Sequence, residues 1–200
     1  RGELGTRGTA EIRAKEAEAS SKILGLAVRE NLAMPDGFFE NTRQYQLKVI
    51  EVIRKYQPEI IITNAHHDRH PDHGRAGKLV EDAVFLSGLR KIETFGAGKP
   101  QDAWRPKQLL HFIQDNYIRP DIVIDITAHW DKKVGSINAF SSQFFNPEWE
   151  GEPQTYISSP EFIAVIEARA REFGKSIGVK YAEGFTSRKI LGVNSLFDLK

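Results

Sequence analysis

Four of the six histidines in this 200-residue chain lie within eight positions, in the segment Asn64-Ala-His-His-Asp-Arg-His-Pro-Asp-His73. Imidazole and carboxylate groups are typical ligands of a catalytic zinc-type ion, which usually has three protein ligands and an activated water. His70 and His73 are three residues apart, and the proline between them stiffens the backbone, so both side chains can point into one pocket. We therefore predict that these two histidines contact substrate or metal.

The remaining histidines have simpler explanations. His66 and His67 are adjacent, and neighbouring side chains on an extended loop diverge, so at most one of them can face such a pocket. Exposure to solvent or packing against the fold is the simpler role for each. His111 and His129 are isolated within segments that resemble regular structure, which favours structural roles for both.

The histidine segment lies between two predicted elements. It directly follows Glu59–Thr63, a short β-branched run typical of a parallel strand that is buried on both faces, and it precedes a predicted helix over 74–86. In open α/β sheets, ligands bind beyond the carboxyl ends of the strands, where this segment must emerge. Asp72 can serve as the N-cap of that helix or as a neighbour of the N-cap.

Helix and strand patterns alternate along the rest of the chain. The predicted helices cover 9–33 with Thr9 as N-cap, 42–56, 129–140, and 160–174 with Ser159 as N-cap. The other predicted strands cover 107–113, 121–127 and 178–185. This alternation predicts a single α/β domain over residues 1–200, Rossmann-like, with a mostly parallel sheet flanked by helices.

Composition limits the classes of partner and compartment. The 28 basic residues nearly balance the 27 acidic ones, so no broad cationic field is expected to attract nucleic acid or a membrane surface. The predicted partner is instead a small molecule. The absence of cysteine excludes disulfides and thiolate metal ligands. No apolar stretch of about 18 residues and no signal-peptide core occurs, which favours a soluble, cytoplasmic protein.

Several motifs in this order resemble one known family. His70-Pro-Asp-His73 follows a hydrophobic strand, and the chain opens with Arg1-Gly-Glu-Leu-Gly-Thr-Arg-Gly and an Arg13-x-x-Glu16 helix start. Together they resemble the LmbE-like (PIG-L) zinc-dependent de-N-acetylases. Further motifs resemble the branch that deacetylates N-acetylglucosaminyl malate in bacillithiol biosynthesis; these are Trp104-Arg-Pro, Asp125-Ile-Thr, Ser142-Gln-Phe144, Pro153-Gln-Thr-Tyr156 and Tyr181-Ala-Glu-Gly-Phe185.

The resemblance implies roles for the catalytic residues. His73 corresponds to a zinc ligand, His70 to the group that protonates or stabilises the tetrahedral oxyanion, and Asp72 to the residue that orients that imidazole. A carboxylate held against an imidazole raises its pKa and fixes its tautomer. Tyr156 corresponds to a hydroxyl donor for the oxyanion or substrate, with a buried core tyrosine as the alternative.

The same resemblance implies a segment that this sequence does not contain. The family's other two zinc ligands, a histidine and an aspartate, and its general base lie in an Ala-His-Pro-Asp-Asp motif after the first strand, and residues 1–200 lack that motif. We therefore expect an N-terminally truncated chain that is inactive alone, with zinc, or iron in its place, bound by the complete protein.

Four residues are candidates for substrate contacts. Arg13 corresponds to an arginine near the sugar, with an ion pair to Glu16 as the alternative, and Asp36 to an acid that binds sugar hydroxyls, with an ordinary turn as the alternative. Arg69 and Arg105 are candidates for the malate carboxylates, because guanidinium binds carboxylate in bidentate fashion, unless they are simply exposed.

The resemblance also implies a homo-oligomer, with a hexamer as one form. Two other functions remain open. The protein can be a deacetylase of another N-acetyl sugar, such as a chitooligosaccharide or an inositol conjugate, or a non-catalytic protein that binds sugar or metal.

Overall fold

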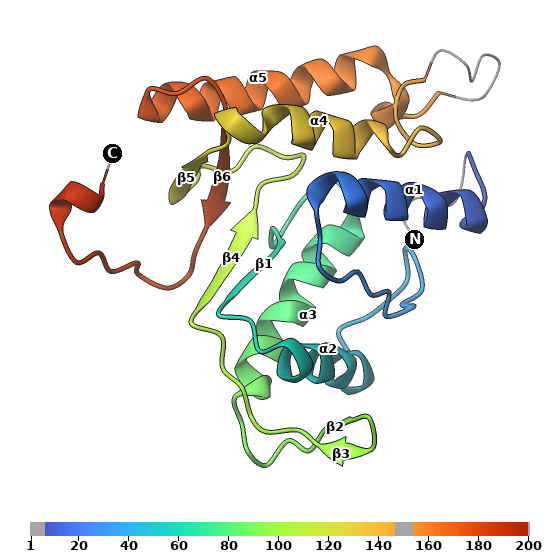
Figure 1. Ribbon diagram of the computed structural model, residues 1–200, viewed down its shortest axis with the longest axis vertical. Helices are drawn as coiled ribbons and strands as arrows, with labels where there is room; N and C mark the ends of the chain where they lie inside the picture. The colour runs from blue at the N-terminus through green and yellow to red at the C-terminus, as the bar shows by residue number, and fades with distance from the viewer. Residues whose placement is uncertain (1–6, 147–153, 200) are drawn as a thin grey trace. The chain divides into compact units, whose positions relative to one another are not determined.

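The computed structural model of the chain describes residues 7–146 and 154–199 (Figure 1). Most of the glycine-rich opening motif, and the first residue of the Pro153-Gln-Thr-Tyr156 motif, lie outside these ranges. The chain divides into two compact units, the first made of Arg1–Asp36 and Val123–Glu183, and the second of Gly37–Ile122 and Gly184–Lys200. No helix in the described ranges is both long and apolar enough to cross a membrane.

The second unit contains the histidine segment. Its elements in chain order are α2 (Arg43–Tyr56), β1 (Ile60–Asn64), α3 (Pro71–Ser87), β2 (Phe95–Gly96), β3 (Lys99–Pro100), β4 (Gln108–Phe112) and η3 (Leu196–Asp198). Strands β1 and β4 pair in parallel, with Ile60 opposite Gln108 and Asn64 opposite Phe112. The segments that follow these two strands therefore emerge at the same edge of the sheet.

The core of this unit lies between α2 and α3. Ile50 and Ile53 of α2 pack against Ala83 of α3, and all three are buried. Trp104 joins this cluster and donates its indole N–H to the carbonyl of Pro58 at 2.8 Å. The buried isoleucines of α2 therefore support α3, the helix that begins at the histidines.

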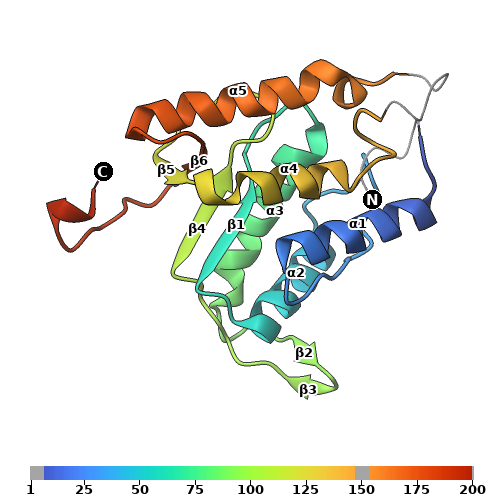
Figure 2. The same ribbon diagram turned by 45° about the horizontal axis from the view of Figure 1, so that its top comes forward.

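The first unit combines the beginning of the chain with a later segment. Its elements are α1 (Ala10–Leu24), β5 (Ile122–Asp125), η1 (Thr127–His129), α4 (Trp130–Asn138), η2 (Tyr156–Ser158) and α5 (Pro160–Ile177). Helix α1 lies alongside α4 (Figure 2). The buried carboxylate of Glu16 accepts hydrogen bonds from the backbone and the hydroxyl of Ser142, at 2.6 and 2.8 Å.

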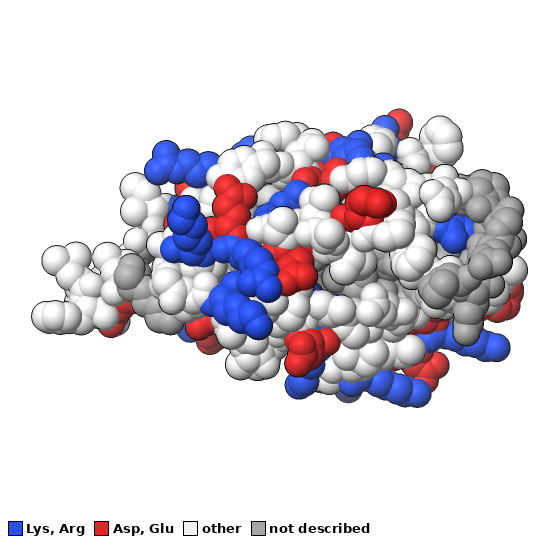
Figure 3. Space-filling model, turned by 90° about the horizontal axis from the view of Figure 1, so that it is seen from above, with Lys and Arg blue, Asp and Glu red and all other residues white. Residues whose placement is uncertain are grey.

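The strand order of the sheet is β1-β4-β6-β5, where β6 spans Ala182–Thr186. The α/β fold is confirmed, and the sheet is mixed, because β4 pairs with β6 in antiparallel fashion through His111 and Thr186. On the face seen in Figure 3, basic and acidic side chains are interspersed. This arrangement agrees with the nearly balanced charge of the sequence.

Three expectations about individual elements were wrong. Helix α1 ends at Leu24, because Gly25 adopts a left-handed conformation with φ of 70° and caps the helix. Helix α3 begins at Pro71 instead of residue 74. Strand β1 is not buried on both faces, since Ile60 and Ile62 are 57% and 54% exposed.

Gly77 allows α3 to approach the end of β1 closely. A Cβ at this position would lie 2.7 Å from the carbonyl oxygen of Asn64 and 3.0 Å from that of Ala65, and neither backbone atom can rotate away. Overpacking typically costs about 1–3 kcal/mol, and the better helix propensity of alanine offsets up to about 1 kcal/mol of it. We expect Gly77→Ala to lower the free energy of urea unfolding by roughly 1–2 kcal/mol.

Gly192→Ala is the matched control for this substitution, because no heavy atom lies within 4 Å of its added Cβ. It should change the free energy of unfolding by less than about 0.5 kcal/mol. Equal urea midpoints for the two variants would show that the close approach of α3 to β1 has no energetic importance.

Candidate active site

His70 is the N-cap of α3, and its ring takes part in the cap. Its Nδ1 accepts a hydrogen bond from the backbone amide of Asp72 at 3.2 Å, and Pro71 occupies the first helical position. Proline is suited to that position because its fixed φ matches the helix and its missing N–H is not needed. Since Nδ1 is the acceptor, the proton of the neutral ring lies on Nε2, which can then donate to an anionic oxygen.

The Asp72 carboxylate does not orient that imidazole. Its Oδ2 accepts from the backbone amide of Gly37 at 2.6 Å, and its Oδ1 accepts from Arg75 at 2.9 Å. The contact with His70 is made by the Asp72 main chain, because a helix starting at Pro71 leaves the amide of residue 72 without an intrahelical acceptor. A contact between a backbone amide and the imidazole therefore takes the place of the carboxylate–imidazole pair that was expected between Asp72 and His70. The N-cap of α3 is His70, not Asp72.

A carboxylate–histidine pair occurs instead at His73. Its Nδ1 lies 2.6 Å from Oδ2 of Asp68, whose side chain is 1% exposed, and the rings of His70 and His73 are 5.2 Å apart. Oδ1 of Asp68 accepts from the amides of Asn116 and Asp115, at 2.7 and 3.2 Å. Burial by itself raises the pKa of Asp68, but the hydrogen bonds from the Asn116 amide and the His73 ring outweigh it, so this pKa lies below its usual value.

The other nitrogen of His73 faces an amide. Nε2 of Gln114 lies 3.2 Å from Nε2 of His73, and Oε1 of Gln114 accepts from the side chain of Asn64 at 3.0 Å. Asn64 ends β1, and Gln114 follows β4, its parallel neighbour. Sequence reasoning missed both Asp68 and Gln114. The available signal was the position of Asp68 within the histidine segment; for Gln114 no local signal existed.

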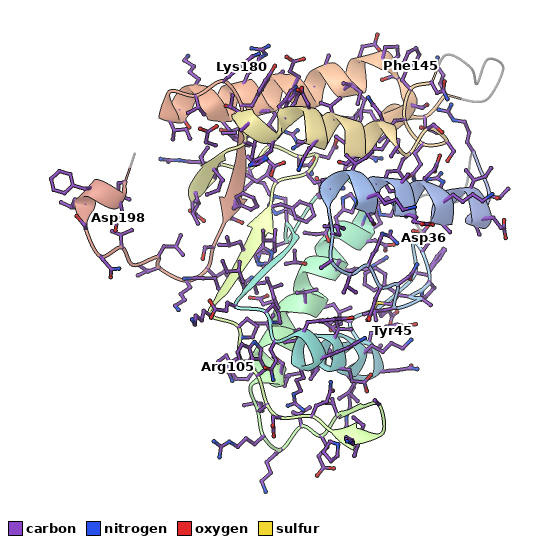
Figure 4. The ribbon with its side chains drawn as sticks, viewed as in Figure 1. Asp36, Tyr45, Arg105, Phe145, Lys180 and Asp198 are labelled. Carbon is purple, nitrogen blue, oxygen red and sulfur yellow. The ribbon has the colours of Figure 1, made fainter. Side chains whose placement is uncertain are left out.

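The two arginines predicted to bind substrate carboxylates behave differently. Arg69 lies beside this cluster, with Nε 3.5 Å from Oδ2 of Asp115. Arg105 lies at the other end of α3, over the backbone of Gly88 and 5.1 Å from the ring of Phe85 (Figure 4). A 17-residue helix is about 25 Å long, so the structure does not bring Arg105 to the histidines, and we leave it out of the proposed site.

Three predicted residues belong to the first unit. Arg13 is buried, donates to the carbonyl of Arg7 at 3.1 Å and lies 3.9 Å from Glu16, so the alternative ion pair is present. Asp36 begins a turn. Tyr156 is 51% exposed and lies edge-on to Phe162, which excludes the buried core tyrosine. Whether these three contact substrate stays a prediction.

Comparison with known proteins identifies the family. The model of the GlcNAc-PI de-N-acetylase family, PIG-L, matches residues 1–84. The crystal structure of the conserved protein TT1542 from Thermus thermophilus is 33% identical, covers 96% of this chain and 80% of its own, and superposes with a TM-score of 0.83. The chain belongs to the PIG-L family.

Three further relatives have named activities. Diacetylchitobiose deacetylase of Thermococcus kodakarensis is 28% identical over 92% of this chain, which spans only 65% of that enzyme. N,N'-diacetylchitobiose deacetylase of Pyrococcus horikoshii is 25% identical over 96% of this chain and 69% of its own, with a TM-score of 0.68. The 4-oxalmesaconate hydratase of Pseudomonas putida is 28% identical over 94% of this chain and 70% of its own. Two of these relatives are named as chitobiose deacetylases and the third as a hydratase, and none of the three is named as a bacillithiol enzyme.

The contacts of His73 fit those of a metal-binding histidine. A metal-ligating histidine almost always gives its second ring N–H to a carboxylate or carbonyl, and His73 does so with Asp68. His73 therefore fits a ligand that binds through Nε2. Within residues 7–146 and 154–199 no group of three or more histidine, aspartate or glutamate side chains is placed to hold a metal ion.

The second histidine pair lies outside the cluster. The rings of His66 and His111 are 4.0 Å apart, and buried His111 lies with Nδ1 2.7 Å from the carbonyl of Asn64. Burial lowers the pKa of His66, and the charges of His111 and Arg188 lower it further. The structural role predicted for His111 agrees with its position in β4.

The lowered pKa of His66 makes stability depend on pH. Above the unfolded pKa of about 6.5 the ring is neutral in both states; below it the unfolded chain binds the proton more readily, so stability falls as pH falls. We expect the free energy of urea unfolding to fall less between pH 7 and about pH 5 in His66→Asn than in the wild type. His67→Asn, at an exposed neighbour, should follow the wild-type curve. Parallel curves for all three proteins would contradict a neutral His66.

Proposed function

We propose that the full-length protein is a metal-dependent amide hydrolase that removes the acetyl group from an N-acetylglucosaminyl conjugate of small size. The observation that carries this proposal is the pair His70 and His73 at the start of α3, with His73 hydrogen-bonded to the buried Asp68 carboxylate. The deacetylase relatives support the reaction type.

The two histidines have different roles in this proposal. His73 would hold the metal ion, zinc by the nature of its donors, and a bound zinc ion supplies a water of lowered pKa and a Lewis acid. His70 would stabilise the oxyanion that forms when the acetamide carbonyl is attacked, because its Nδ1 is held by the Asp72 amide and its Nε2–H can donate a hydrogen bond to that oxygen. Tyr156 is proposed as a second hydroxyl donor, with Arg13 and Asp36 as sugar contacts.

The substrate is proposed at two levels of detail. An N-acetylglucosaminyl group is the part that the family description and the chitobiose deacetylases have in common. A malate aglycone would need a cationic partner, and Arg69 is the proposed one because it lies beside the cluster. The disaccharide diacetylchitobiose is the competing substrate.

Acetate release by the metal-loaded, full-length protein tests the proposal. The panel contains N-acetylglucosaminyl malate, diacetylchitobiose and an N-acetylglucosaminyl inositol conjugate. We expect acetate from at least one, and equal rates with and without the malate group would exclude malate specificity. No acetate from any conjugate would overturn the deacetylase proposal.

A hydratase is the second candidate, because the Pseudomonas putida enzyme is as similar to this chain as the Thermococcus deacetylase. Including 4-oxalmesaconate in the panel separates the two reactions. The cytoplasmic location and the homo-oligomeric state stay predictions, which cell fractionation and light scattering can check.

A further inference from the structure

We propose that Asp68 is a positioning residue that holds His73 in the tautomer with its proton on Nδ1, so that Nε2 is left as the metal-binding atom. This inference rests on the proposed function, in which His73 is a metal ligand. It concerns a residue five positions before His73 whose side chain is almost completely buried.

The direction of the hydrogen bonds on both sides of the ring supports this tautomer. A carboxylate only accepts hydrogen bonds, so the 2.6 Å contact with Oδ2 of Asp68 requires His73 Nδ1 to donate. On the other side, the oxygen of Gln114 accepts from Asn64, which directs the Gln114 amino group toward Nε2 of His73. An amino group donates, so Nε2 must be the acceptor.

The two oxygens of Asp68 have separate tasks. Oδ2 contacts His73, and Oδ1 accepts from the amides of Asp115 and Asn116. These bonds connect the segment after β1, which carries Asp68, to the segment after β4. The same carboxylate that makes this connection also contacts the ring of His73. At 1% exposure water cannot replace these bonds, so the carboxylate holds the proton on Nδ1 of His73.

Asp68→Asn tests this division. Two backbone N–H groups point at one side of the residue, so the amide oxygen of asparagine must turn toward them. Its NH₂ group then faces Nδ1 of His73, which must accept, and the proton moves to Nε2. A protonated Nε2 cannot bind a metal ion. We expect zinc affinity to fall by about 10–100-fold, the usual effect of losing such a carboxylate.

Two measurements on the full-length protein provide the readout. Long-range ¹H–¹⁵N spectra of the metal-free protein show the tautomer of His73, and competition with a chromophoric chelator gives zinc affinity. We expect the Nδ1–H tautomer in the wild type, the Nε2–H tautomer in Asp68→Asn, and no change in Asp121→Asn. Asp121 is the matched control, because its Oδ2 accepts from a backbone amide, that of Ser187 at 2.9 Å, instead of from a histidine ring.

A wild-type His73 with its proton on Nε2 overturns the proposal, as does an Asp68→Asn variant with unchanged tautomer and zinc affinity. Should Asp68→Asn fail to fold, Gln114→Ala decides, because it keeps Asp68 and removes the opposite partner. It should retain the Nδ1–H tautomer; a changed tautomer would assign the role to Gln114. Neither measurement uses acetate release, so an inactive protein with the expected tautomers would remove the proposed function alone.

Discussion

Replacing His73 by alanine should abolish zinc binding by the full-length protein, whereas replacing His70 by alanine should leave zinc bound and lower kcat by about 10²–10⁴-fold. The two variants differ because a lost ligand removes the ion, while a lost proton donor removes only the stabilisation of the oxyanion. Their rings are 5.2 Å apart at the start of α3, so the two substitutions compare neighbouring positions of the same helix end.

Metal content by atomic absorption and acetate release by the same samples measure this split. His67→Ala is the control within the same segment, because that side chain is exposed, and it should leave both quantities unchanged. Equal metal content in His70→Ala and His73→Ala would contradict the assignment of one proton donor and one ligand.

Replacing Arg54 by methionine should lower the free energy of unfolding by about 3 kcal/mol or more, the largest expected effect on stability. The buried guanidinium donates to the carbonyls of Ser87, Leu89 and Ile92, at 3.1, 2.9 and 2.6 Å, and to the hydroxyl of Thr94 at 2.8 Å. Methionine fills a similar volume but removes all four hydrogen bonds. The carbonyls of Ser87 and Leu89 keep a backbone donor, from Trp104 and Ile92, so the loss falls mainly on the Ile92 carbonyl and the Thr94 hydroxyl. Each unsatisfied buried group costs about 1–3 kcal/mol in isolation.

Urea unfolding measures the effect of Arg54→Met, with Arg105→Met as control. Arg105 lies at the same end of α3, but its side chain is exposed and rests on Phe85 and Gly88. We expect a loss of less than about 1 kcal/mol there, the scale of an exposed cation–π contact. Similar losses for the two arginines would mean that the hydrogen bonds of Arg54 contribute little.

Local sequence patterns predicted where the helices and strands lie better than they predicted how exposed these elements are. Periodicity placed the start of α2 within a residue, and Thr9 accepts a hydrogen bond from the amide of Ile12, as the N-cap predicted for α1 should. The apolar composition of β1 did not reveal that Ile60 and Ile62 are half exposed, because a β-branched run specifies a strand and not what covers it.

The candidate site was predictable only in part. The density of histidines in one short segment pointed to His70 and His73. Gln114 contacts His73 across 41 residues, and Asn116 contacts Asp68 across 48, because β1 and β4 pair in one particular register. No local pattern contains that register. The same limit explains the error at Asp72, whose carboxylate partner Gly37 is 35 residues away.

The cap at the start of α3 has a consequence for how the chain tolerates change. The ring of His70 is held by a peptide amide, which every amino acid except proline supplies at position 72. A substitution at position 72 would therefore preserve the orientation of the His70 ring. It would instead remove the hydrogen bond that the Asp72 carboxylate accepts from the backbone amide of Gly37. Because the partner of the His70 ring is a main-chain amide, the orientation of the ring tolerates substitutions that would remove a side-chain partner.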